Sequence, residues 1–119
     1  MGRRPKKPST GLPFESDWLL WIYGALLARG KGIRYQGGLR CSRQIDDTME
    51  RLNVDVGRFR LVVWADGLAW LRIGRETFYS DIVGMEPSEV VERLKKTIHA
   101  PSFARTFWPP YEGEPGTGG

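Results

Sequence analysis

Apolar residues recur along this chain with two spacings, one typical of helices and one typical of strands. The run "WLLWIYGALLA" at residues 18–28 is apolar around almost its whole circumference, with Ser16 as a typical N-cap before it and Gly30 as a stop after it. The sequence therefore predicts a helix over residues 17–29. Because such a helix must be covered on both sides, it is either a central helix beneath a sheet or a helix that meets another subunit or a ligand.

The same kind of pattern predicts two further helices and a short strand. After the capping residue Ser42, apolar residues recur at intervals of four and three, which predicts a helix over residues 42–53. A second stripe predicts a helix over residues 87–99, and alternation between glycines predicts a short strand over residues 31–38. The stripes consist of Ile45, Met49 and Leu52 in the first of these helices, and of Val90 or Val91, Leu94 and Ile98 in the second.

Three strands are predicted between residues 58 and 82. The stretches "RFRLVVWA", "LAWLRI" and "ETFYSDI" alternate apolar and polar residues, and the pairs Asp66–Gly67 and Gly74–Arg75 between them favour two-residue hairpin turns. Together with the helices, these strands predict an α+β fold, in which an antiparallel sheet of three to four strands is packed with about three helices.

The turns also predict which side chains share a face of the sheet. Two-residue turns place Ala65 opposite Leu68 and Ile73 opposite Glu76, and side chains then alternate between the two faces. The apolar face, expected to pack on the helices, consists of Val62, Trp64, Ala69, Leu71, Ile73, Phe78 and Ile82, with Arg60 and Ser80 at its margins. The opposite, mixed face consists of Phe59, Leu61, Val63, Leu68, Trp70, Arg72, Thr77, Tyr79 and Asp81.

The mixed face brings aromatic rings and an arginine together. Trp70 and Tyr79 are predicted to be cross-strand neighbours, with Arg72 beside them. Aromatic rings stack on nucleic-acid bases, a contact worth about 1 to 3 kcal/mol per base, and Arg either stacks or binds phosphate. Alternatively, this face is a second core layer packed on the first helix, with Arg72 and Asp81 paired at its rim.

Composition and charge favour a nucleic-acid partner. The 119 residues suffice for one domain, and 18 Lys and Arg against 14 Asp and Glu give a net charge of +4. Thirteen of these cations are Arg, which favours nucleic acid over a membrane, and the longest apolar run is shorter than the roughly 20 residues of a membrane span. Residues 1–13 are expected to be a flexible basic arm, residues 14–111 the single domain, and residues 112–119 a flexible tail.

Rare residue types point to the cellular setting. Cys41 is the only cysteine, so no intrachain disulfide is possible and a cytoplasmic location is favoured. The opening residues lack the apolar run of a secretory signal. One Asn, two Gln and one Cys are a scarcity of heat-labile side chains, which favours a thermophilic source.

The sequence does not indicate catalysis, a metal or a cofactor. His99 is the sole histidine and has no catalytic partner at a recognisable spacing. The adjacent residues Asp46 and Asp47 would diverge by roughly 100° on the predicted helix, so they do not form a carboxylate pair. The chain has too few His and Cys residues for a typical metal site and contains no glycine-rich phosphate-binding motif.

The central half of the chain resembles a family of nucleic-acid-binding proteins. The stretches "KGIRYQGGLR", "RFRLVVW" and "LAWLRIGRETFY" are similar to the ThermoDBP group of archaeal single-stranded nucleic-acid-binding proteins. The resemblance implies an antiparallel sheet packed with helices, and a cleft whose apolar floor holds bases between basic walls. The founding type also has a long C-terminal helical zipper, whereas this chain ends in "PPYEGEPGTGG" and looks more like the shorter relatives.

The sequence therefore predicts a nonenzymatic protein that binds single-stranded DNA or RNA with little sequence preference. The predicted nucleic-acid-binding residues are Arg34, Tyr35, Arg40, Arg58, Phe59, Arg60, Trp70, Arg72 and Tyr79. The alternative is a protein-interaction or regulatory module that uses helix 17–29 and the C-terminal aromatics as its interface. Those aromatics lie in "SFARTFWPPY", residues 102–111, which we expect to be a structural flap over the sheet. The sequence leaves a homodimer open.

Overall fold

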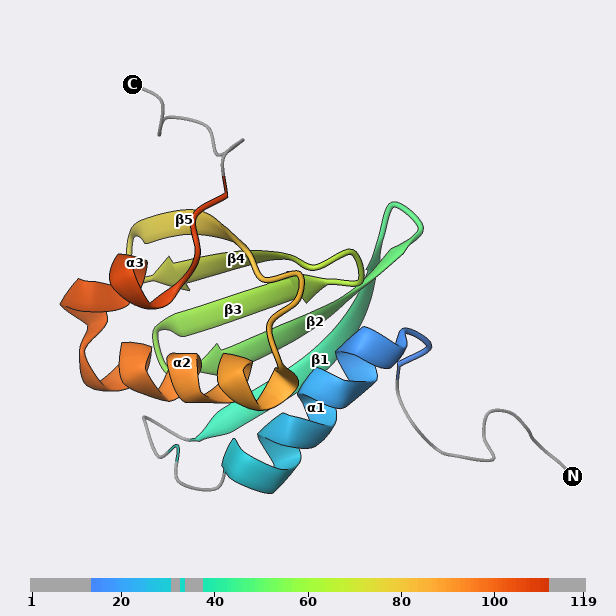
Figure 1. Ribbon diagram of the computed structural model, residues 1–119, viewed down its shortest axis with the longest axis horizontal. Coiled ribbons are helices and arrows are strands. Elements are labelled where there is room, and N and C mark those ends of the chain that lie inside the picture. Colours follow the sequence, from blue (N-terminus) through green and yellow to red (C-terminus); the bar gives the residue numbers. More distant parts are fainter. Residues whose placement is uncertain (1–13, 31–32, 34–37, 112–119) are drawn as a thin grey trace, which may run out of the picture.

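The computed structural model describes residues 14–30, 33 and 38–111 and shows an α+β fold (Figure 1). Its elements, in chain order, are α1 (Asp17–Arg29), β1 (Leu39–Asp46), β2 (Met49–Val56), β3 (Phe59–Trp64), β4 (Leu68–Ile73), β5 (Glu76–Asp81), α2 (Pro87–His99), η3 (Pro101–Phe103) and α3 (Ala104–Phe107). The strands form one antiparallel sheet in the order β1-β2-β3-β4-β5. The predicted fold class is confirmed, but the sheet has five strands rather than three to four.

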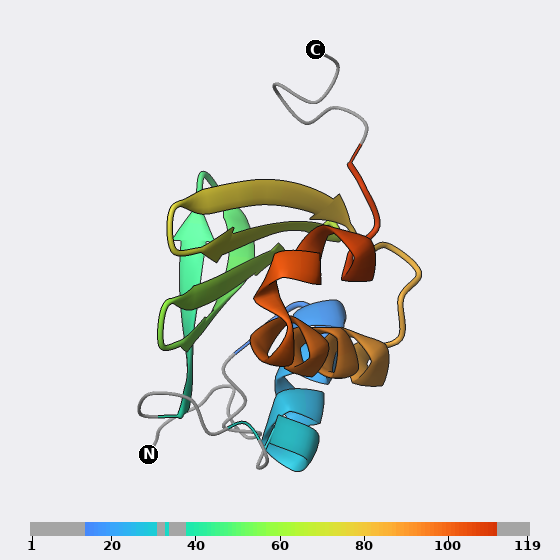
Figure 2. The same ribbon diagram turned by 90° about the vertical axis from the view of Figure 1, so that its left-hand side faces the viewer.

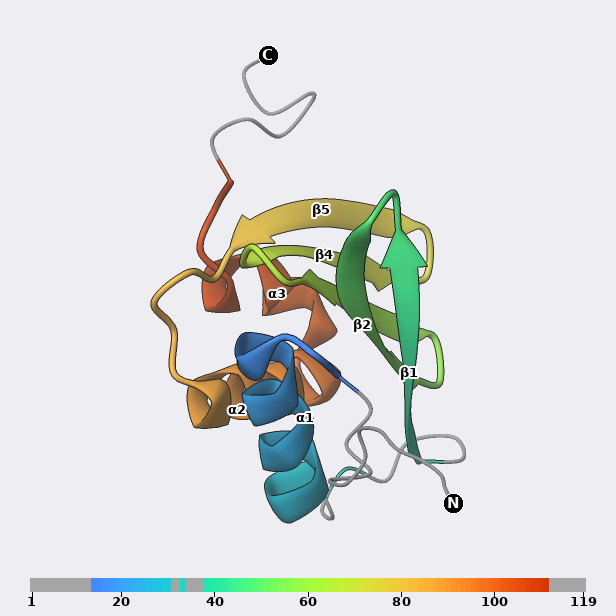
Figure 3. The ribbon, with the colours of Figure 1, turned by 90° about the vertical axis from the view of Figure 1, so that its right-hand side faces the viewer.

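The helices lie on one side of the sheet. Figure 2 shows α1 and α2 packed against the same face, and Figure 3 shows the strong twist of the sheet between β1 and β5. Apolar side chains of the helices and of the facing strand positions form the core between these two layers. Its fully buried members include Leu19, Ile22 and Leu26 of α1, Leu52, Val54, Val56, Leu61, Val63, Ala69 and Leu71 of the sheet, and Val90, Val91 and Leu94 of α2.

The helix predicted over residues 42–53 is wrong, because residues 39–56 form a β-hairpin. Asp47 and Thr48 at its tip have φ of 55° and 73°, as the turn type that matches strand twist requires. Apolar residues of β2 point into the core with the period of two of a strand, and their contacts with β3 outweigh the local helical spacing. These cross-strand pairs are Leu52↔Val63, Val54↔Leu61 and Val56↔Phe59.

Several sequence predictions concern residues outside the described part of the chain. Of the strand predicted over residues 31–38, only Ile33 and Gly38 are described, and neither belongs to a strand. The predicted basic arm, residues 1–13, and the predicted tail, residues 112–119, also lie outside the described residues.

The loop between β3 and β4 is one residue longer than predicted. Val63 pairs with Ala69, so the loop holds residues 65–67 and not the Asp66–Gly67 pair alone. Gly67 has a φ of +96°, and a Cβ at this position would lie 2.2 Å from Val83 Cγ2, so glycine fits for two reasons. The longer loop shifts the register of β3 by one residue, and this exchanges the two faces of that strand.

The corrected register moves every side chain of β3 to the face opposite the predicted one. Phe59, Leu61 and Val63 are buried against the helices, whereas Arg60, Val62 and Trp64 lie on the opposite face. The faces predicted for β4 and β5 are confirmed, including the two-residue turn that places Ile73 opposite Glu76.

The C-terminal segment packs against the fold as the flap interpretation predicts. Trp108 is 3% exposed, and its Nε1 donates a hydrogen bond to Thr97 Oγ1 on α2 at 2.8 Å. Ser80 Oγ of β5 donates to the carbonyl oxygen of Pro109 at 2.6 Å, and Ser80 forms an isolated bridge with Pro110. The segment therefore runs along the β5 edge of the sheet.

Candidate nucleic-acid interface

The face of the sheet turned away from the helices is the candidate site, and we call it the open face. Strand register and alternation assign its side chains to three rows that cross the strands. The first row is Arg40, Asp55, Arg60, Arg72 and Thr77; the middle row is Ser42, Asn53, Val62, Trp70 and Tyr79; the third row holds Gln44, Arg51, Trp64, Leu68 and Asp81. The second-core-layer interpretation is wrong, because α1 packs on the other side of the sheet (Figure 2).

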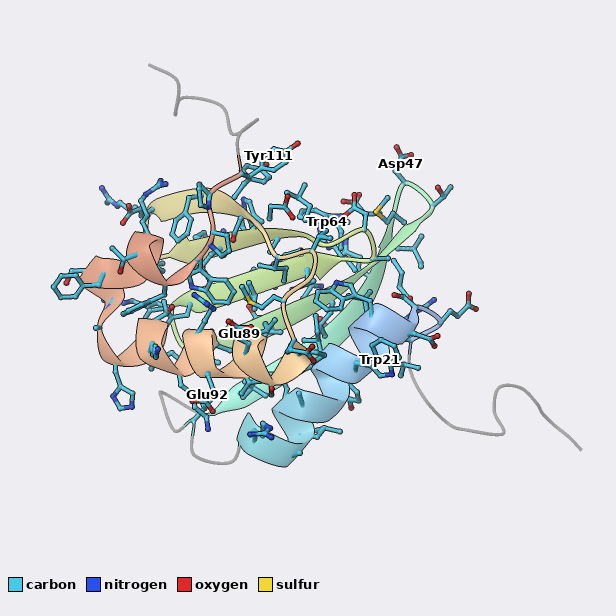
Figure 4. The ribbon with its side chains drawn as sticks, viewed as in Figure 1. Trp21, Asp47, Trp64, Glu89, Glu92 and Tyr111 are labelled. Atoms are coloured by element: carbon cyan, nitrogen blue, oxygen red, sulfur yellow. The ribbon has the colours of Figure 1, made fainter. Side chains whose placement is uncertain are left out.

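Aromatic rings occupy one half of the open face. Trp70 and Tyr79 pair directly across β4 and β5, as the sequence predicts. The ring of Tyr111, at the end of the C-terminal segment, lies 6.2 Å from that of Tyr79 at an interplanar angle of 42°. Figure 4 shows Trp64 on the sheet and Tyr111 beside β5. Because Trp70 and Tyr79 are both half-buried, part of each ring remains accessible to a ligand.

Two arginines hold the tryptophans in place. The guanidinium of Arg72 lies 5.5 Å from the centre of the Trp70 ring, and that of Arg51 lies 5.7 Å from the centre of the Trp64 ring. A cation over an aromatic face is attracted by the ring quadrupole, which favours these orientations. Each arginine therefore restrains a ring and also places positive charge beside it.

Two side chains of the middle row, Val62 and Asn53, are buried although no described helix covers them. Val62 is 1% exposed and Asn53 is 4% exposed. Both side chains are therefore shielded from solvent although they lie on the open face. Asn53 Nδ2 donates to Ser42 Oγ at 3.2 Å and to Gln44 Oε1 at 3.3 Å, while Asn53 Oδ1 is buried without a hydrogen-bond partner among the described residues.

Positive charge gathers at the end of the sheet where β2 meets β3 and β4 meets β5. The first row of the open face crosses this end, and the two turns beyond it add exposed arginines. This basic end consists of Arg40, Arg58, Arg60, Arg72 and Arg75. The opposite end carries the acidic residues Asp46, Asp47, Asp66 and Asp81. The open face therefore presents charges of opposite sign at its two ends.

The arginines of the open face differ in their partners. Arg60 forms a two-pronged ion pair with Asp55, with Nε and Oδ1 2.7 Å apart, and this hydrogen bonding raises the pKa of Arg60 above its ordinary value. Arg51 donates to Gln44 Oε1 at 2.8 Å and to Asp46 Oδ2 at 3.4 Å. Within the described ranges, Arg40 and Arg72 form no ion pair and are exposed, so their charges are available to a ligand.

The structure brings together most of the predicted site residues that it describes. Arg40, Arg60, Trp70, Arg72 and Tyr79 share the open face, and Arg58 lies in the adjacent β2–β3 turn. Arg34 and Tyr35 lie outside the described residues.

Phe59 is a correction to the predicted site. It is 2% exposed and lies on the core side of β3, because the longer β3–β4 loop changes the register. The guanidinium of Arg58 lies 5.6 Å from its ring centre. A ring buried in this way cannot stack on a base.

The predicted site omits two open-face residues, Trp64 and Arg51, and also Tyr111, whose ring contacts Tyr79 of that face. A two-residue β3–β4 turn assigns Trp64 to the core face, and the predicted second helix contains Arg51. Tyr111 belongs to the predicted flap, and nothing in its local sequence signals a contact with Tyr79. Only a three-residue loop at residues 65–67 predicts that Trp64 lies on the open face.

Other kinds of site find no support in the described part of the chain. No group of three or more His, Cys, Asp or Glu residues there is placed to hold a metal ion. None of the described helices is long and apolar enough to cross a membrane. Comparisons with protein-family models, with curated proteins and with solved structures find no match to this chain.

Proposed function

We propose that this chain binds single-stranded DNA or RNA, with little sequence preference, on the open face of its sheet. The observation that carries the proposal is the Trp70–Tyr79 pair on a face that no described helix covers, directly beside the basic end. An aromatic ring stacks on any base because every base has a π face, so stacking supplies affinity without sequence readout.

The two parts of the site suggest how a strand lies on it. The phosphates would follow the basic end across the strands, where Arg40 and Arg72 are exposed and unpaired in the described structure. The bases would then point along the strands toward the middle row, onto Trp70 and Tyr79. The acidic residues at the other end would repel a second backbone, which favours one strand over two.

Duplex nucleic acid is the poorer partner for this arrangement. Its bases are already stacked within the helix and present no free faces to Trp70 or Tyr79, so only the phosphate contacts remain. The resemblance to ThermoDBP proteins is part of the same proposal, since an apolar floor beside a basic wall is what that family implies. Base stacking and phosphate binding require neither a catalytic residue nor a cofactor.

The experiment is a titration of one fluorescently labelled oligonucleotide, as a single strand and as its duplex, at several salt concentrations. We expect tighter binding of the single strand and weaker binding as salt rises, because each phosphate contact releases a counterion. Arg72→Ala should lower the salt slope by about 0.7, the contribution of one phosphate in a single strand, whereas Lys96→Ala on α2 should leave it unchanged. Equal affinity for single strand and duplex would contradict base stacking.

A protein-interaction function remains the second candidate because of one observation on α1. Trp21 and Leu27 are 62% and 57% exposed on that helix, which is more apolar surface than a solvated helix needs. The C-terminal aromatics give the protein-interaction function less support, because Trp108 is buried and packs in the core. An interface would therefore centre on α1.

A further inference from the structure

The outward side of α1 is an apolar surface that the rest of the described chain leaves uncovered. The helix buries Leu19, Ile22 and Leu26 against the core. Its opposite side, which we call the outer face of α1, consists of Leu20, Trp21, Gly24, Leu27 and Ala28. Leu20 is half-buried at the edge of this face and packs partly against the core, whereas the other four residues are exposed. Figure 4 shows Trp21 on this helix.

On the outer face of α1, apolar residues lie at equal distances on either side of Gly24. Large side chains lie three residues on either side of Gly24, at Trp21 and Leu27, and Leu20 and Ala28 lie four residues on either side. In an antiparallel helix pair centred on Gly24, Trp21 of one chain meets Leu27 of the other, and Leu20 meets the small Ala28. A Cβ built on Gly24 has nothing within 4 Å, so a second backbone has room to approach there.

Charge along α1 supports the same antiparallel arrangement. Its beginning is acidic, with exposed Glu15 and Asp17, and its end is basic, with exposed Arg29. An antiparallel pair brings the acidic end of each helix toward the basic end of the other and opposes the two helix dipoles favourably. A parallel pair would instead bring like charges together.

We propose that the outer face of α1 is an interface between two copies of this chain, packed antiparallel around Gly24. Such an interface is isologous, so it closes with two chains and does not propagate. Because α1 and the open face lie on opposite sides of the molecule, both open faces stay accessible in the dimer (Figure 2). Dimerisation through α1 is therefore compatible with nucleic-acid binding on the open face and does not require it.

Cysteine cross-linking tests the register of the two helices. Gly24→Cys places two thiols at the two-fold axis, where close backbone approach permits a disulfide. Ala28→Cys, on the same face, is the matched control: across the axis the two Cα atoms are separated by about 12 Å along the helices, from a rise of about 1.5 Å per residue. This separation exceeds the Cα spacing of about 4 to 7 Å that a disulfide requires. Cys41 is present in both variants, and burial raises its pKa to about 11, so it reacts slowly and equally in each.

We expect disulfide-linked dimers of Gly24→Cys to form at least about tenfold faster than those of Ala28→Cys, since only the first lies on the axis. Equal rates would overturn the proposal, because a nonspecific apolar patch has no register. The native chain should also show a dimer in sedimentation velocity at micromolar concentrations. Gly24→Glu, which places a charge against its own copy, should be monomeric, whereas Ser102→Glu on η3 should dimerise normally. A native chain that stays monomeric up to millimolar concentrations would assign the outer face of α1 to a different partner and overturn the proposal.

Discussion

Replacing Glu50 with Gln should destabilise the fold more than any other single change of a carboxylate to its amide among the described residues. Glu50 is the second residue of β2, lies on the helix side of the sheet and is 8% exposed. Its Oε1 accepts hydrogen bonds from the backbone N–H of Ser16 at 2.8 Å and of Glu15 at 3.1 Å. Its Oε2 accepts from Glu15 N–H at 3.0 Å and from Arg43 Nε. One carboxylate thus anchors the start of α1 to the β1–β2 hairpin.

The magnitude follows from these contacts. Gln keeps one acceptor oxygen but places an NH₂ group against a donor, so at least one charge-assisted hydrogen bond is lost. Such bonds contribute about 1.5 to 3 kcal/mol each, and the side chain of Arg43 can turn to solvent, which limits the penalty. We therefore expect Glu50→Gln to lower the free energy of unfolding by about 2 kcal/mol, and the melting temperature by about 8 °C or more.

The loss should also depend on pH. Burial alone would raise the pKa of Glu50, but hydrogen bonds from Arg43, Glu15 and Ser16 outweigh it and hold the pKa below its ordinary value. A lowered folded-state pKa stabilises the fold above the unfolded-state pKa of about 4.3, and that stabilisation disappears as pH falls through the folded-state pKa. The difference between native and Glu50→Gln should be full at neutral pH and shrink in acid below about pH 4.

Urea unfolding at neutral and acid pH measures both expectations. Glu76→Gln is the control, because Glu76 is an exposed carboxylate in an exposed pair with Arg105 and its loss should change stability by less than about 0.5 kcal/mol. If Glu50→Gln behaves like Glu76→Gln at neutral pH, the anchoring role derived for Glu50 is incorrect.

Three further predictions concern the flap, one loop and the basic arm. Trp108→Phe should lower stability by about 1 to 2 kcal/mol in urea unfolding, since it removes the buried hydrogen bond to Thr97; no change would mean that the flap adds nothing to the core. Gly67→Ala should be destabilised by about 1 kcal/mol or more, through its positive φ and the approach of the new methyl group to Val83, and a thermal melt matching the native one would contradict this. Deleting residues 1–11 should leave the melt unchanged but flatten the salt dependence of oligonucleotide binding, and an unchanged slope would exclude the arm from binding.

The sequence correctly predicts the elements whose ends are marked by local capping or turn residues. The helix over residues 17–29 has a capping Ser16, whose Oγ accepts from Leu19 N–H at 3.3 Å, and the helix over residues 87–99 begins at a proline. The Gly74–Arg75 turn sets the register of β4 and β5 correctly, which is why the sequence places Trp70 and Tyr79 together.

Nonlocal contacts decide what the sequence does not show. The spacing of Ile45, Met49 and Leu52 fits a helix. Pairing with β3 stabilises residues 49–56 as a strand instead, and no local sequence feature identifies β3 as the partner. The Asp66–Gly67 pair is compatible with a two-residue turn and with the end of a three-residue loop. Because the two alternatives differ by one residue, the sequence predicts Phe59 on the open face, where the structure has Trp64 instead. Tyr111 reaches the open face only because the flap follows β5.

The affinity of Trp70→Ala for a short single-stranded oligonucleotide tests the account most directly. Trp70 is half-buried on the open face, so its loss should lower stability by less than the roughly 3 to 5 kcal/mol expected of a fully buried tryptophan. Binding should weaken by about 1 to 3 kcal/mol at every salt concentration, with an unchanged salt slope, because the lost contact is stacking and not charge. Phe103→Ala, which removes another exposed ring on η3, should bind like the native chain. Unchanged affinity of folded Trp70→Ala would contradict the proposal that the open face binds single strands.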